Sequence, residues 1–288
     1  MNPAPSVVIF TVLSGLGFGF LALLGVFGSA GMAAFFLWAL GYGLAVAGLV
    51  ASTFHLGNPQ RALLAFTQWR TSWLSREAWA SVVTLLLFAP QAVSDWLGLE
   101  WGRGFGMAGA AMAFVTVYCT SMIYAQIRAV PRWHHWTVPA VFLAYALSGA
   151  LVMGAVRPYA AWMLVLLGIA LALHWHFGKS AFARAGASME SATGLGRIGA
   201  VSVFEQPHTG GNYLMREMIF VVGRKHADRV RMIAMVCSVM LPVLALMFIP
   251  GVAAVIVAVA VHLLGALAQR WLFFAEAEHV VGLYYGAH

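Results

Sequence analysis

Charged residues are scarce in this chain of 288 residues. Lysine, arginine, aspartate and glutamate make up 9% of the sequence, hydrophobic residues make up 62%, and the mean hydropathy is +0.87. Soluble globular proteins carry about 25% charged residues, so this composition cannot cover a water-exposed surface. The shortage of charge excludes a soluble protein and predicts an integral membrane protein.

Cysteine is nearly absent. The chain has two, Cys119 and Cys237, which lie in separate apolar segments and form no CxxC pair. Iron–sulfur clusters and structural zinc sites need groups of closely spaced cysteines. We therefore expect no such metal centre in this chain, and we interpret both cysteines as small buried hydrophobic residues.

Acidic residues are fewer than basic ones, 9 against 16, and the formal charge is +7. A basic chain can bind nucleic acid, but basic residues spread along an apolar chain more often report membrane topology, and no nucleic-acid partner is expected. The N-terminus has no basic segment before its apolar run. We interpret that run as a membrane span and not as a cleaved signal peptide.

Eight apolar segments reach about the 20 residues that a membrane-spanning helix needs. They cover approximately 7–28, 32–56, 77–98, 104–128, 135–157, 160–179, 230–249 and 251–276. They must be helices, because backbone groups find no water partners in lipid. The predicted fold is all-α: a polytopic integral membrane protein, with residues 1–288 forming one bundle of eight transmembrane helices.

Two connections are long, 57–76 and about 180–229, and we expect short surface helices in both. In the second, "NYLMREMIF" (212–220) resembles an amphipathic helix at the interface or against a partner. Eight spans place both termini on one side, together with every lysine and arginine except Arg103 and Arg157. The positive-inside rule then predicts that both termini and both long connections are cytoplasmic.

The stretch "ASTFHLGNPQRA" (51–62) ends the second span and contains His55. Gly57 suits a left-handed position that closes a helix, Asn58 is a good N-cap, and Pro59 suits the first position of a new surface helix. Ser75 can cap the third span.

This reading of the turns places His55, Arg61, Arg76 and Glu77 at one membrane depth. A quinone site needs donors for the carbonyl oxygens and a group that exchanges protons near neutral pH. Histidine, with an unperturbed pKa of about 6.5, suits the second role, and a carboxylate can orient it or relay protons. The alternative is that His55 only caps a helix and that Arg61 binds lipid headgroups or sets topology.

"HLGNPQRA", followed by "SWLSREAW", resembles the signature of the anchor subunits of dimethyl-sulfoxide-reductase-type enzymes, the DmsC family. The matching positions are His55, Leu56, Gly57, Pro59, Arg61 and Ala62, then Leu74, Ser75 and Glu77. The long loop, the ending "QRWLFFAEAEHVVGLYYGAH" and the charge bias are more similar to the anchors of sulfite dehydrogenases. The length and the number of spans also agree, so the resemblance covers nearly the whole chain.

The resemblance implies a function that composition alone does not give. Such an anchor holds a molybdopterin catalytic subunit and a four-cluster iron–sulfur subunit at the bacterial inner membrane and exchanges electrons with quinone, either menaquinone or ubiquinone. It is not itself catalytic for the main substrate and carries no molybdenum. By motif position His55 is implied as the quinone-linked histidine. We expect the partners on the cytoplasmic side and a role in sulfite oxidation.

The last span carries polar residues at heptad spacing, His262, Gln269 and Glu276, with His279 one turn further. They share a helix face. This stripe could be a proton path, a second wall of the quinone site formed by Arg270, Glu276 and His279, or a set of interhelical hydrogen bonds. Arg270 could pair with Glu276, Glu278 or Glu77.

Histidines within the spans leave a second function open. His174 and His176 point to opposite faces of the sixth span, and one of them paired with His262 could ligate a b-type haem, which would make the chain a cytochrome subunit. His134 and His135, flanked by tryptophans, resemble an interfacial belt. A transporter is the third alternative, but the matched broken helices that many transporters show are missing from the sequence.

Overall fold

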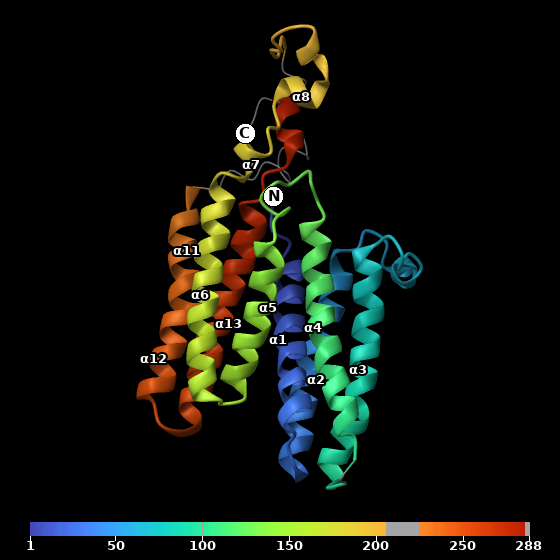
Figure 1. Cartoon of the computed structure of the whole chain (residues 1–288), viewed down its shortest axis with the longest axis vertical. Coiled ribbons are helices and arrows are strands. Elements are labelled where there is room, and N and C mark those ends of the chain that lie inside the picture. Colours follow the sequence, from blue (N-terminus) through green and yellow to red (C-terminus); the bar gives the residue numbers. More distant parts are fainter. Residues whose placement is uncertain (100, 206–224, 286–288) are drawn as a thin grey trace.

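The computed structural model describes residues 1–99, 101–205 and 225–285, and in this part of the chain every regular element is a helix. The long helices lie side by side in one bundle (Figure 1). They are α1 (Pro5–Phe27), α2 (Gly31–Ala51), α3 (Trp73–Leu97), α4 (Arg103–Ala125), α5 (Thr137–Met153), α6 (Arg157–Lys179) and α13 (Gly251–Ala275). Between α6 and α13, α11 (Ala227–Met235), a π-helical turn (Val236–Met240) and α12 (Leu241–Phe248) form one continuous segment.

Seven of the described helical segments are long and apolar enough to cross a membrane: α1, α2, α3, α4, α6, the segment from α11 to α12, and α13. The remaining apolar helix, α5, has 17 residues. At 1.5 Å per residue it is about 25 Å long, whereas the hydrocarbon core is about 30 Å thick. The protein is therefore an integral membrane protein, and the expected eighth crossing depends on α5.

Both ends of the described chain lie at the same end of the bundle (Figure 1). The α-amino group of Met1 donates a hydrogen bond to the Ala277 carbonyl, 2.9 Å away, just after α13. The short helices α7 (Ala181–Arg184) and α8 (Met189–Thr193) and the C-terminal 3-10 helix Val280–Tyr285 also lie there. We call this the terminal end of the bundle.

The centre of the bundle is α1. In its most apolar stretch 72% of the residues are buried in protein, against 28–50% in the other six candidate spans. The side chains of Phe18 and Phe20 are 1% exposed. α2 packs closely on it because Gly48 has no side chain: a β-carbon there would overlap the backbone of Ser14. The arrangement leaves α3 and α4 with faces on the outside of the bundle.

The connection after α2 differs from the expected turn in detail. α2 continues into a 3-10 helix, Ser52–His55, and a second 3-10 helix, Pro59–Phe66, starts at the expected proline. Gly57 does not take a left-handed conformation and the Asn58 side chain caps nothing. The i→i+3 bonds of the 3-10 turn, such as Leu56 N to Thr53 O at 3.2 Å, already close the helix.

The start of α3 is also earlier than expected. The helix begins at Trp73 after Ser72, so Ser75 lies inside the first turn, where its buried hydroxyl has no hydrogen-bond partner among the described residues. Glu77 lies beyond that turn and faces the protein interior. The expected amphipathic helix at 212–220 lies outside the described residues.

Candidate functional site

An aromatic groove lies on the outer face of α3 and α4, near the terminal end of the bundle. Its volume is about 600 Å³, and it is lined by Phe66, Trp69, Arg76, Trp79, Ala80, Val83, Met112, Val115 and Cys119. Several of these side chains, such as Trp69 at 56% and Val115 at 45%, are exposed on the outside of the bundle. We call this the aromatic groove; it is open on the outside of the bundle.

Arg76 fixes a positive charge in the aromatic groove. Its Nε donates to the Trp69 carbonyl at 3.0 Å, and its Nη2 donates to the Arg70 carbonyl at 2.6 Å. The guanidinium carbon lies 4.4 Å from the ring centre of Trp73, within cation–π range. These contacts hold the charge in place. They use two of the five N–H donors of the arginine, so the other donors can bind a ligand.

A carboxylate lies directly behind the groove. Glu77 follows Arg76 but faces inward, is 4% exposed, and accepts a hydrogen bond of 2.5 Å from the Thr120 hydroxyl. Thr120 follows Cys119 of the groove wall. None of the described residues forms an ion pair with Glu77. An ionisable residue inside a membrane bundle is costly and is by default a candidate functional residue.

Arg61 lies in a separate groove of about 420 Å³, which also involves Leu56, Asn58, Gln68 and Ser72. The two grooves have no lining residue in common. The His55 backbone ends the 3-10 helix just before this second groove, and its side chain lies outside what the structure describes. The four residues expected at one site are thus divided: Arg76 and Glu77 meet at the aromatic groove, and Arg61 does not join them.

Glu276 is occupied by two arginines. Its carboxylate pairs with Arg132 of the α4–α5 connection at 3.1 Å and also with Arg231 of α11. The carboxylate side chain is 6% exposed. Of the three alternatives for Arg270, pairing with Glu276 is not found among the described residues, because Arg270 lies almost two turns earlier on α13 and faces the internal cavity. The Glu276 cluster ties three separate elements together at the terminal end.

The Glu276 cluster carries a stability prediction. Glu276→Gln is expected to destabilise the protein by about 3–5 kcal/mol, because it removes the buried anion that two largely buried guanidinium groups share. Unfolding of the purified complex by titration with denaturing detergent measures this. Asp228→Asn is the matched control, since Asp228 also pairs with Arg231, at 2.6 Å, but its side chain is 91% exposed; an exposed pair contributes at most about 1 kcal/mol. Equal effects of the two substitutions would contradict a structural role for Glu276.

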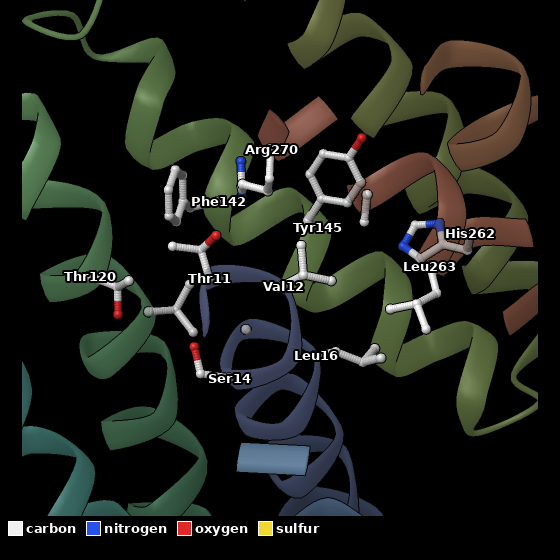
Figure 2. Close-up of a pocket in the computed structure, with 13 residues that line it drawn as sticks. Thr11, Val12, Ser14, Leu16, Thr120, Phe142, Tyr145, His262, Leu263 and Arg270 are labelled. Atoms are coloured by element: carbon white, nitrogen blue, oxygen red, sulfur yellow. The ribbon is translucent and has the colours of Figure 1, made fainter. Parts of the chain in front are cut away.

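Arg270 lies against a small cavity between α1, α4, α5 and α13 (Figure 2). It is 3% exposed, its Nη1 donates to Gln269 Oε1 at 2.8 Å, and its guanidinium carbon lies 3.6 Å from the ring centre of Phe142. His262 lines the same cavity, and its Nδ1 lies 2.9 Å from the Ser238 carbonyl. The stripe His262, Gln269 and Glu276 is therefore buried, and His262 and Glu276 make contacts between helices.

The expected second wall of the quinone site is not at the aromatic groove. Arg270 faces the internal cavity and Glu276 the arginine cluster. His279 accepts a hydrogen bond from the backbone of Val281 at 3.0 Å, within its own turn. Heptad spacing predicted that His262, Gln269 and Glu276 share a helix face but could not predict which helix each one meets.

The profile of the DMSO reductase anchor subunit (DmsC) family matches residues 1–275. The chain belongs to the DmsC family. A sulfite dehydrogenase subunit of Allochromatium vinosum is 33% identical to it over 325 aligned positions, which cover 99% of each protein. The family expected from the two motifs is confirmed, and the protein is a membrane anchor subunit of a molybdoenzyme.

The interior of this DmsC-family anchor does not fit a haem at the expected histidines. His174 is 3% exposed, its Nδ1 lies 3.0 Å from the Thr137 hydroxyl, and its ring packs on Phe273. The cavity beside His262 has a volume of about 20 Å³, which is far too small for a porphyrin. His176 is exposed in the last turn of α6 and packs on Phe177.

His135 lies just before α5, outside the spans, and contacts the same residue as His174. Its Nδ1 lies 2.9 Å from the same Thr137 hydroxyl that meets His174. Partial burial and the nearby Arg184 guanidinium lower the pKa of His135 below its ordinary value, so its ring is mainly uncharged at neutral pH. Trp133, expected in an interfacial belt, is instead 3% exposed and donates to the Phe273 carbonyl at 3.1 Å.

The positions of two residues at the candidate site could not be predicted from the sequence. Thr120 bonds Glu77, and Cys119, which is buried as expected, also contributes to the wall of the aromatic groove. A signal was present: Thr116, Thr120 and Ser121 recur within one apolar span. Polar side chains at helical spacing in lipid usually face a partner helix.

Proposed function

We propose that this anchor exchanges electrons between an iron–sulfur partner subunit and membrane quinone, and that the quinone headgroup binds in the aromatic groove. The supporting observation is the combination found there: a lipid-open groove with aromatic walls, a fixed guanidinium and a buried carboxylate behind the wall. A volume of about 600 Å³ lies within the range of 300–1,000 Å³ typical of small-molecule sites.

The chemistry of quinone matches these groups. Reduction of a quinone adds two electrons and two protons at the headgroup while the apolar tail stays in lipid. Arg76 can donate a hydrogen bond to a carbonyl oxygen and so orient the ring. Glu77 can exchange a proton near that oxygen, and His55, by its family motif position, is the second candidate for proton exchange. Both menaquinone and ubiquinone have the required carbonyl oxygens.

The partner enzyme is proposed to oxidise sulfite. The relative that matches over its full length is part of a sulfite dehydrogenase. In this proposal a molybdopterin subunit oxidises sulfite, the electrons pass through a four-cluster iron–sulfur subunit, and the anchor delivers them to quinone. The anchor itself does not bind sulfite.

The proposed topology has eight crossings, with α5 as the eighth. The Met1–Ala277 hydrogen bond supports it, because a chain that starts and ends on one side must cross an even number of times. Arg103 and Arg157 start α4 and α6 at the opposite end, and the other described lysines and arginines lie toward the terminal end. By the positive-inside rule this distribution supports termini and a partner-binding face on the cytoplasmic side of a bacterial inner membrane.

Arg76→Gln tests the proposed function in the intact complex. Sulfite-dependent reduction of a soluble quinone analogue is expected to lose roughly ten- to a hundredfold in kcat/KM, the effect of removing a hydrogen bond from a charged donor. Sulfite oxidation with an artificial dye reports the partner subunits and should stay normal. Arg70→Gln is the control, since Arg70 lies over Trp69 but does not line the groove. Equal quinone kinetics in the two variants would contradict the site.

A further inference from the structure

Glu77 and Arg270 are buried in the same bundle, and each lacks an ionic partner among the described residues. Both are at most 4% exposed. A charge buried without a partner is unfavourable, and the Glu276 cluster shows that this protein pairs other buried charges directly. The exception at Glu77 and Arg270 therefore needs a physical explanation.

Thr120 connects the two residues. Its hydroxyl donates to Glu77, and the same residue lines the small internal cavity that Arg270 also lines. In Figure 2 the labelled Thr120 and His262 lie on opposite sides of this cavity, with Arg270 between them. The cavity thus begins one side chain away from the carboxylate behind the aromatic groove.

The cavity has the size of a water site, and its mainly apolar wall carries a few polar groups. Its volume is about 20 Å³. One water molecule needs roughly 10–15 Å³ by the same measure, so the cavity can hold one or two waters. Thr11, Ser14 and Tyr145 line it beside Arg270, and the hydroxyls of Thr11 and Ser14 already donate to carbonyl oxygens of α1, so toward a water they can only accept. An ordered buried water needs two to four polar partners, and Arg270, His262 and the hydroxyl-bearing residues of this wall can supply that number.

The protein groups leave donors and acceptors for that water. Only one hydrogen bond from the five N–H groups of Arg270 goes to a described side chain, Gln269. His262 Nδ1 faces a carbonyl oxygen, which can only accept, so Nδ1 carries the proton. In the uncharged imidazole Nε2 is then an acceptor. The Tyr145 hydroxyl is held by Ser238 at 2.8 Å.

We propose that this cavity binds water, and that the water links the Arg270 guanidinium through Thr120 to the Glu77 carboxylate. Arg270 is then a positioning residue: it does not touch the quinone but stabilises the charge and orientation of the group behind the groove. This inference rests on the proposed quinone site for its functional consequence, whereas the water site itself does not.

A double-mutant cycle in the intact complex tests the link. Arg270→Gln alone is expected to lower quinone turnover about tenfold, and Thr120→Val, of nearly the same shape, by a similar factor. In a Glu77→Gln background each should cost less than about twofold, because the group they act on has lost its charge. Arg270→Lys should restore most of the turnover. Arg157→Gln, an arginine at the other end of the bundle, is the control.

The alternative outcomes are distinct. If Arg270→Gln and Thr120→Val cost the same factor with and without Glu77, their role is structural and the proposal is wrong. If Arg270→Gln prevents assembly of the complex, the effect of Thr120→Val is compared with and without Glu77→Gln, and the same criterion applies. If Glu77→Gln leaves quinone turnover unchanged, the proposed role of Glu77 in the quinone site fails instead.

A high-resolution cryo-EM map of the complex in lipid nanodiscs tests the water directly. Density for one or two waters within hydrogen-bond distance of Arg270 and Thr120 is expected. An empty cavity, or a direct contact between Arg270 and Glu77, would overturn the water site.

Discussion

Glu77→Gln is expected to lower quinone-linked turnover of the complex by about a hundredfold or more, while dye-linked sulfite oxidation stays within about twofold. A positioned proton-exchanging group contributes typically 10²–10⁴-fold to a reaction. Glutamine keeps the size of the side chain and can still hydrogen-bond Thr120, so the fold should tolerate it. Steady-state kinetics with sulfite and either a quinone analogue or a dye separate the two activities in one preparation.

Asp95→Asn is the matched control for Glu77→Gln. Asp95 lies on the same helix at the opposite end of the bundle, where it accepts hydrogen bonds from the Ser29 backbone and the Trp38 indole, both at 3.0 Å. Its replacement perturbs α3 without touching the aromatic groove. A comparable loss of quinone turnover in this variant would show that any disturbance of α3 is harmful, and the specific role of Glu77 would be lost.

His55→Ala is expected to have the second large effect, a loss of quinone turnover of about a hundredfold with normal dye activity. The expectation rests on the family motif and on the intrinsic pKa of histidine, about 6.5, which lets it exchange protons at neutral pH. The backbone of His55 lies directly before the second groove, and the helix that follows carries Phe66 of the aromatic groove at its far end.

His176→Ala is the control for His55→Ala. His176 is an exposed histidine in the last turn of α6, also at the terminal end. Loss of quinone turnover in both variants would point to damaged docking of the partner subunits, whereas normal turnover in His55→Ala would remove this residue from the mechanism.

The positions of the helices could largely be predicted from the sequence, because hydrophobic length alone determines where a chain can cross lipid. The polar stripe of α13 was likewise expected to face inward. Its partners could not be predicted: Arg132, Arg231 and Ser238 come from other elements and meet α13 only through packing.

At the candidate site, too, contacts between helices could not be predicted from the sequence. Arg76 and Glu77 are neighbours in the sequence, so the motif suggests one cluster, but successive residues of a helix point about 100° apart. One therefore lines the groove and the other faces Thr120. The groove forms only when α3 packs on α4, which no local sequence pattern encodes. The position of Arg270 beside Thr120 likewise depends on the cavity that four helices enclose.

Photoaffinity labelling with an azido-quinone in the intact, membrane-embedded complex tests the central claim most directly. The account predicts labelled peptides from the walls of the aromatic groove, around Trp69, Trp79 and Met112, with labelling suppressed by excess natural quinone and weakened in Arg76→Gln. Competed labelling confined to the second groove, around Arg61 and Gln68, or to helices outside α3 and α4, would contradict it.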